Sequence, residues 1–128
     1  MITLATLKDA TEQQVFDQVA SHLLIQNERA EYGGACVYHL ELSDRTLKCA
    51  AGCLISDEEY DPEFEDSCWE NLAATERVTD HHSALIAELQ GCHDDTDPVD
   101  WPELLYEIAA RWELSPAVVR NRKASHDQ

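Results

Sequence analysis

The segment from Lys48 to Tyr60, KCAAGCLISDEEY, constrains the fold most, because it changes abruptly from small and apolar residues to acids. Residues 50–52 are Ala, Ala and Gly, so another part of the backbone can approach this segment closely. Residues 53–55 then supply apolar bulk. The pattern predicts that the segment lies at the centre of the core. It is read as a strand end or a short helix, because periodicity over so few residues does not separate the two.

Acidic residues dominate the middle of the chain, from residue 57 to residue 103. The stretch 57–66, DEEYDPEFED, holds seven acids in ten residues, and unpaired carboxylates are not buried, so it should face solvent or a basic partner. The whole chain has a formal charge of −17, and residues 57–103 carry 16 acids against Arg77 alone. Such a field repels nucleic acid and anionic membranes and attracts basic surfaces. The alternative is that the acids only maintain solubility.

The overall composition is that of an ordinary globular domain. A chain of 128 residues with 44% hydrophobic and 27% charged residues fits one domain with one core. We expect this domain at residues 1–123, followed by a frayed tail at 124–128. The sequence shows neither a signal-peptide pattern nor an apolar stretch long enough to span a bilayer. An odd number of cysteines, five, favours reduced thiols and a cytoplasmic location.

The first half of the chain predicts one helix and one hairpin. Thr11 and Gln14 form a capping-box pattern, and an apolar stripe follows, so a helix is expected over residues 12–26, with Gly33 and Gly34 after it. The stripe consists of Val15, Phe16, Val19, Ala20, Leu23 and Leu24. Residues 35–42 and 46–47, separated by turn residues, predict a short antiparallel hairpin.

The second half of the chain is predicted to be helical. Ser67 and Glu70 resemble a second capping box, and Thr79 or Asp80 should open a further helix that Gly91 closes.

A third capping box is predicted at Asp100 and Glu103, with Val99 packing on Leu104 as a hydrophobic staple. A last short helix, capped by Ser115 and started by Pro116, should run to about residue 122. The sum is an α+β fold, mostly helical, with about five helices and one small antiparallel hairpin.

Two blocks of the chain carry a resemblance to a known family. Residues 13–26, QQVFDQVASHLLIQ, and residues 47–65, LKCAAGCLISDEEYDPEFE, resemble a family of small bacteriophage and prophage proteins without an established activity. The resemblance implies a phage source and a host-cytoplasm setting, and it carries over no catalytic residue. It also implies that a small acidic phage protein would bind and inhibit a host or host-defence protein, an analogy independent of fold.

A zinc site is the strongest metal hypothesis that the sequence offers. Cys36, His39, Cys49 and Cys53 have the spacing C-x2-H-x9-C-x3-C, and thiolates with imidazole suit zinc. However, Cys36 and His39 would face opposite sides of a strand, and the chain has no CxxC pair. Small buried hydrophobic cysteines are the preferred reading, so no cofactor is expected.

Other chemical sites have weaker support. The pairs His81–His82 and Cys92–His93 lie at opposite ends of a predicted helix, about 15 Å apart, which is too far for one metal. The acidic loop 94–100 lacks the glycine and glutamate of a calcium loop, so solvated helix-capping acids are the preferred reading. Cys49 with His39 would be the choice for a nucleophile and base, but an enzyme is not expected.

The C-terminal region resembles a helix-turn-helix. Residues 107–121, EIAARWELSPAVVRN, have the apolar pattern of two packed helices, and Arg120, Arg122 and Lys123 could contact phosphates. Glu113 replaces the usual small turn residue, and the acidic middle of the chain opposes approach to DNA. Packing of two terminal helices is therefore preferred, and nucleic acid is not the expected partner.

The preferred function is that of an acidic interaction protein that binds a basic host or defence protein in the manner of a nucleic-acid mimic. Charge would steer the encounter of the two proteins, and aromatic residues buried at the interface would stabilise the complex. The alternatives are a small DNA-binding regulator and a zinc-binding module. The predicted acidic surface consists of Asp57, Glu58, Glu59, Asp61, Glu63, Glu65, Asp66, Asp94, Asp95, Asp97 and Asp100. The predicted aromatic anchors are Tyr60, Phe64, Trp69 and Trp101.

Overall fold

Helices form most of the molecule in the computed structural model, which describes residues 1–120 apart from the side chain of Asp66. The α-helices are α1 (Glu12–Gln26), α2 (Trp69–Ala74), α3 (Ser83–Asp95) and α4 (Trp101–Arg111), and residues 117–120 are the described part of a fifth helix. The α+β class and the helix number are confirmed, with 52% of the described residues helical. None of the described helices is long and apolar enough to cross a membrane.

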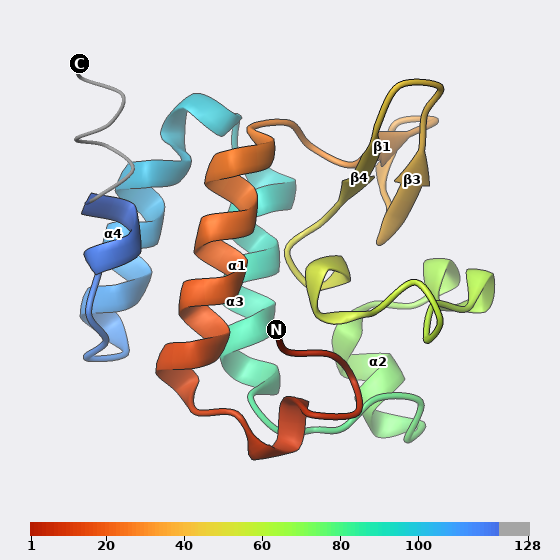
Figure 1. Cartoon of the computed structure of the whole chain (residues 1–128), viewed down its shortest axis with the longest axis horizontal. Coiled ribbons are helices and arrows are strands. Elements are labelled where there is room, and N and C mark those ends of the chain that lie inside the picture. The colour runs from red at the N-terminus through yellow and green to blue at the C-terminus, as the bar shows by residue number, and fades with distance from the viewer. Residues whose placement is uncertain (121–128) are drawn as a thin grey trace.

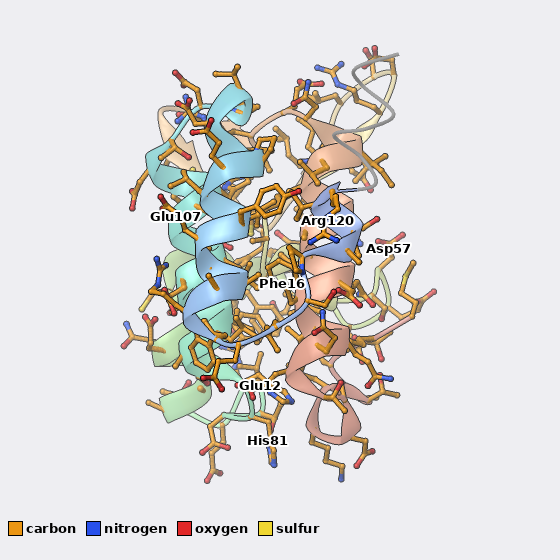
Figure 2. All side chains as sticks on the ribbon, turned by 90° about the vertical axis from the view of Figure 1, so that its left-hand side faces the viewer. Glu12, Phe16, Asp57, His81, Glu107 and Arg120 are labelled. Atoms are coloured by element: carbon orange, nitrogen blue, oxygen red, sulfur yellow. The ribbon has the colours of Figure 1, made fainter. Side chains whose placement is uncertain are left out.

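A bundle of α1, α3 and α4 forms the body of the molecule. The three helices pack against one another, α1 and α3 run in the same direction, and α4 runs back beside them (Figure 1). The short helix α2 packs against α3 on the side of the molecule away from α4. Phe16 points from α1 into the space beside α4 and is fully buried (Figure 2).

The helix α1 has the predicted bounds and the predicted cap. The Thr11 side chain accepts a hydrogen bond from the Gln14 backbone N–H (3.1 Å), and the Gln14 side chain accepts one from the Thr11 N–H (2.9 Å). Five of the six predicted stripe residues are buried, and Leu24 is half-buried. The helix ends where Asn27 adopts the left-handed conformation, at φ 52°.

The predicted cap of α2 is wrong. The N-cap of this helix is Cys68, and Ser67 lies one residue outside it with an extended backbone. The hydroxyl of Tyr38 donates a hydrogen bond to the Ser67 carbonyl (2.7 Å), which holds Ser67 against the strand region. The Ser67 and Glu70 capping box therefore does not form.

The predicted start and end of α3 are also wrong. The Thr79 hydroxyl bonds with His81, so it caps a turn, and α3 begins only at Ser83 after His82 at φ 66°. At the other end, Gly91 lies inside the helix, which continues to Asp95.

The start of α4 differs from the prediction too. A 3-10 turn, Pro98–Asp100, leads directly into the helix, and the Asp100 side chain makes no capping hydrogen bond. Val99 is 82% exposed, so it cannot staple to Leu104. The turn keeps Val99 on the outer side of the corner between α3 and α4.

The structure has two small hairpins where one was predicted. The expected one pairs β3 (His39–Glu41) with β4 (Thr46–Lys48), with Leu40 opposite Leu47. The additional one pairs β1 (Glu31–Tyr32) with β2 (Ala35–Cys36). Gly33 and Gly34 connect its strands at φ 63° and 84°. These two glycines, predicted only to follow the first helix, therefore form the turn of a hairpin.

The segment at residues 48–55 is central, as predicted, and contains a 3-10 helix at Gly52–Leu54. Ala50, Ala51 and Leu54 are fully buried. A Cβ at Gly52 would overlap the carbonyl oxygen of Tyr38, so the close backbone approach inferred from the small residues is confirmed.

The C-terminal helix is described at residues 117–120. The Ser115 hydroxyl accepts a hydrogen bond from the Ala117 N–H (3.2 Å), which confirms the predicted cap, and Val119 is fully buried. The predicted end near residue 122, the domain limit at 123 and the tail 124–128 lie outside the described residues.

Candidate functional site

The first acidic stretch, residues 57–66, contains a carboxylate that binds backbone. The Glu59 carboxylate accepts hydrogen bonds from the N–H groups of Leu4 (2.9 Å), Ala5 (2.9 Å) and Ser56 (3.0 Å). Burial opposes ionisation, but the hydrogen bonds from Ser56, Leu4 and Ala5 outweigh it and lower the pKa of Glu59. Glu59 therefore ties the N-terminal segment to the end of the core segment.

Glu65 has a similar role on the other side of the stretch. Its carboxylate accepts hydrogen bonds from the backbone N–H groups of Tyr38 (2.8 Å) and His39 (3.2 Å). The Tyr60 hydroxyl donates a further bond to it at 2.5 Å. Glu65 thus binds two backbone N–H groups at the start of β3. We call Glu59 and Glu65 the clamp carboxylates.

Three more acids of this stretch pair with cations of the same chain, and one of them is Glu63, which contacts Arg77 at 3.5 Å. Asp57 contacts Lys48 at 3.1 Å, and the hydrogen bond from Lys48 lowers the pKa of Asp57. Asp61 contacts Arg77 at 3.0 Å. The acids of this stretch that remain largely exposed to solvent are Asp57, Glu58 and Glu63.

The predicted aromatic anchors are not on the surface. Phe64, Trp69 and Trp101 are 5%, 2% and 0% exposed, so they belong to the core and cannot contact a partner. Tyr60 is half-buried, with its ring stacked on His39 at 4.7 Å. The prediction of exposed anchors is wrong because a chain with 7% aromatic residues uses its largest rings to fill the core.

The second acidic stretch forms an exposed corner between α3 and α4. We call it the acidic corner; it consists of Asp95, Asp97, Val99, Asp100 and Glu103, all of them exposed. Asp97 has a long ion pair with Arg29, at 3.7 Å. Figure 1 shows this corner at the top of the bundle and residues 57–66 at the right-hand side, so the two stretches do not share one compact surface.

Asp94 belongs to a buried polar cluster and not to the acidic corner. Ligand atoms of Cys36, His93 and Asp94 all lie within 4.8 Å of one another. His93 is fully buried, and its Nε2 accepts a hydrogen bond from the Ala30 N–H (3.0 Å). The ring proton must therefore be on Nδ1, which donates to the Asp94 carboxylate at 2.7 Å.

The chemistry of this cluster is that of a hydrogen-bond network. Burial and then a hydrogen bond to Asp94 raise the pKa of Cys36 to about 12, so the thiol stays protonated. Burial opposes ionisation of Asp94, but hydrogen bonds from His93, Cys36 and Gln90 lower its pKa. A metal at Nδ1 would have to displace a proton that the Ala30 contact keeps there, so the arrangement does not suit a metal ion.

The predicted zinc ligands are not brought together. Of Cys36, His39, Cys49 and Cys53, only Cys36 falls in a group with metal-ligand spacing among residues 1–120. His39 stacks on Tyr60, and the Cys53 thiol donates to the Ala50 carbonyl. Cys49 is 1% exposed and burial raises its pKa, which makes it unsuited to act as a nucleophile with His39. The sequence analysis missed that Cys36 lies beside His93, although His93 continues the buried stripe of α3 after Leu89.

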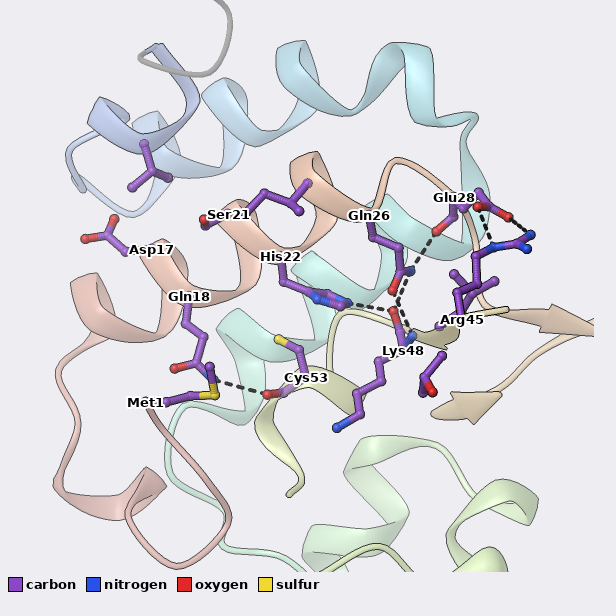
Figure 3. A pocket seen from close by; sticks show the side chains of 14 residues that line it. Met1, Asp17, Gln18, Ser21, His22, Gln26, Glu28, Arg45, Lys48 and Cys53 are labelled. Atoms are coloured by element: carbon purple, nitrogen blue, oxygen red, sulfur yellow. Dashed lines mark hydrogen bonds and ion pairs between the residues drawn. The ribbon is translucent and has the colours of Figure 1, made fainter. Parts of the chain in front are cut away.

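A groove of about 840 Å³ runs along the outer face of α1 (Figure 3). Its floor is α1 from Asp17 to Gln26, with Val118 on one wall and the segment 46–53 on the other. The His22 Nε2 donates to the Lys48 carbonyl at 2.8 Å, and burial lowers the pKa of His22, so the ring is neutral. The sequence reasoning missed this groove, because it depends on three segments that are far apart in the chain.

The helix-turn-helix region packs against α1. Glu113 is left-handed at φ 57°, the conformation that glycine favours in such turns, and the Gln13 side chain binds both the N–H (2.8 Å) and the carbonyl (3.0 Å) of Ser115. Arg120 is exposed at the front of the molecule in Figure 2. Arg122 and Lys123 lie outside the described residues.

Comparisons with known proteins give no match: no protein-family model fits the chain, and no curated protein or solved structure is significantly similar to it. The resemblance to phage proteins stays a prediction.

Proposed function

We propose that the protein is an acidic interaction protein that binds a basic partner, and that the acidic corner is its binding surface. One observation carries the proposal: five of the seven Lys and Arg side chains in residues 1–120 already pair with acids of the same chain. Few cations remain to neutralise the rest of a chain with a formal charge of −17. The excess negative charge is therefore directed at solvent and at other molecules.

The acidic corner is the part of the predicted surface that best fits this role. Asp95, Asp100 and Glu103 are exposed and form no ion pair with any described cation. Val99, 82% exposed, provides an apolar contact among them in place of the buried aromatic residues. Charge would steer the encounter, and burial of Val99 would add to the stability of the complex.

The partner we propose is a basic protein whose surface normally faces nucleic acid, such as a host or host-defence protein. Carboxylates on a protein surface offer such a site negative charge in place of phosphates. The resemblance of residues 13–26 and 47–65 to phage proteins motivates the choice of a host partner.

The test is a pull-down from bacterial lysate at low and high salt with two triple variants. Asp95→Asn/Asp100→Asn/Glu103→Gln neutralises the acidic corner. Glu58→Gln/Glu76→Gln/Glu113→Gln removes the same charge from exposed acids elsewhere. We expect basic proteins to be captured at low salt and lost with the first variant only. Equal capture by both variants, or capture insensitive to salt, would contradict the proposal.

The DNA-binding alternative is tested in parallel. A gel shift of duplex DNA at low salt that Arg120→Glu abolishes would replace the acidic-interaction proposal with a small regulator. Absence of any shift at low salt would exclude the regulator, because phosphate contacts are strongest under that condition.

A further inference from the structure

The groove on α1 has the shape of a helix-binding site. Asp17, Ser21 and Ile25, with their neighbours Gln18, His22 and Gln26, repeat every four residues, so they form one face of α1. The face from residue 17 to residue 26 is about 14 Å long at 1.5 Å per residue. That length matches the two to three turns over which a bound helix presents its apolar residues at i, i+3 or i+4, and i+7.

Apolar side chains line this groove but are left uncovered. Ile25 is 63% exposed, and Met1 at the opposite rim is exposed throughout. Val118 and Cys53 also line the groove and are half-buried. A flexible methionine at the rim of an apolar groove suits recognition of apolar side chains of various shapes.

The charges of the groove favour a cationic occupant. Arg45 pairs with Glu28 at 2.8 Å and with Asp44, and Lys48 pairs with Asp57, so the Lys and Arg side chains of the groove already have acidic partners. Asp17 bonds with the neutral Gln13 side chain (2.8 Å) and with no cation of the described residues. The groove thus combines apolar walls with an uncompensated carboxylate at one end, on a molecule of charge −17.

We propose that this groove binds an amphipathic, basic helical segment of a partner protein. The apolar residues of that segment pack between Val118 and the segment 46–53, over Ile25, and a Lys or Arg side chain meets Asp17. A segment of a protein fits better than a small ligand, because the groove is open along its length and the negative field extends beyond its rim. This inference rests on the proposed function, since it names the class of segment that a basic partner would present.

The experiment measures fluorescence anisotropy with two labelled model peptides of about 14 residues made of Leu and Lys. One has Leu at helical spacing, and the other has the same composition in a scrambled order without an apolar face. We expect the amphipathic peptide to bind at least about ten-fold more tightly than the scrambled one.

Two matched pairs of variants locate the binding. Ile25→Ser should weaken binding of the amphipathic peptide about five-fold or more, whereas Tyr32→Ser, at another exposed apolar residue, should leave that binding unchanged. Asp17→Asn should weaken binding of the amphipathic peptide a few-fold and reduce the salt dependence of its affinity. Glu58→Gln is the control for the loss of one negative charge. Thermal unfolding by circular dichroism should show that Ile25→Ser is folded, because Ile25 is on the surface.

The outcomes separate this inference from the proposed function. If both peptides bind equally and the acidic-corner triple variant abolishes binding, the function stands and the groove proposal is wrong. If Ile25→Ser removes binding but the corner variant does not, the groove stands and the acidic corner is wrong as the binding surface. If Ile25→Ser has no effect, or neither peptide binds, the groove proposal is overturned.

Discussion

The helical bundle and the segment at residues 49–66 satisfy their backbone groups in different ways. In α1 the backbone bonds with itself, and one capping box closes its first turn. The segment 49–66 has only short 3-10 turns, and the N–H groups of Ser56, Tyr38 and His39 in and around it are bound by carboxylates. Acids next to this segment therefore act as hydrogen-bond acceptors for a backbone that forms no regular ladder.

The difference shows that the acidic residues of this chain have two structural roles. Glu59 and Glu65 are buried enough to hold backbone, while Glu58 and Glu63 beside them in sequence face solvent. A run of acids is thus not one surface. The net charge gives the field of the whole molecule, but only the structure separates the carboxylates that fold the chain from those that can contact a partner.

Substitution of Gly52 should have the largest effect. A Cβ at Gly52 would overlap the Tyr38 carbonyl, so Gly52→Ala should destabilise the protein by about 3 kcal/mol. The matched control is Gly91→Ala in α3, where a Cβ meets only Asp95 Oδ2 at 3.7 Å and helix propensity improves by about 0.5–1 kcal/mol. Urea unfolding of both variants measures the contrast. Equal unfolding free energies for Gly52→Ala and Gly91→Ala would mean that the segment at residues 48–55 is not packed against Tyr38 as described.

Acid should have the next largest effect, through Glu59. The pKa of Glu59 is lower in the folded state than its ordinary value of 4.5, so its contribution is complete above that pH and is lost as the pH falls through the lower folded value. The same sign holds for Asp94 against its ordinary value of 3.8. The stability difference between wild type and Glu59→Gln should therefore shrink as the pH falls from about 5 to about 3.

Protonation at acid pH also relieves charge repulsion across the whole protein. Most of that relief is common to wild type and Glu59→Gln, so it cancels when their unfolding free energies are subtracted. Urea unfolding at several pH values measures this difference. A difference that is independent of pH would mean that Glu59 does not act as an ionised acceptor.

Thiol reactivity should show the smallest effect and compares the two regions directly. Cys49 in the irregular segment and Cys92 in α3 are 1% and 6% exposed, and burial raises the pKa of both thiols. Cys53 is half-buried, and its pKa is raised to about 12. Cys68 is exposed. A thiol-specific disulfide reagent at neutral pH should therefore give one fast reaction, absent in Cys68→Ser. Reaction of Cys49 faster than that of Cys92 would show that the irregular segment opens more readily than the helix.

Local signals predicted the parts of the fold that depend on local interactions. The helix over residues 12–26 could be predicted with its cap, because the capping box and the apolar stripe lie within it. The start of α3 could not, because Thr79 and Asp80 are good caps in sequence but take part in a turn. The hairpin around Gly33 and Gly34 was missed, since its strands have only two residues each.

Long-range contacts limited the prediction of the candidate site. Nothing in the run DEEYDPEFED distinguishes Glu59 from Glu58, since the Glu59 partners Leu4 and Ala5 are more than 50 residues away. Cys36 and His93 come together for the same reason, through contacts between β2 and α3. The buried position of His93 could have been predicted from its place on the apolar stripe of α3.

Equilibrium urea unfolding of two double variants tests most directly whether the acids divide into folding and surface groups. Glu59→Gln/Glu65→Gln and Glu58→Gln/Glu63→Gln remove the same charge from the same stretch, so relief of repulsion is matched. We predict that the first loses about 2–5 kcal/mol, because charged acceptors of backbone N–H groups are weakened, and that the second changes by less than about 1 kcal/mol. Equal unfolding free energies for the two variants would contradict the account.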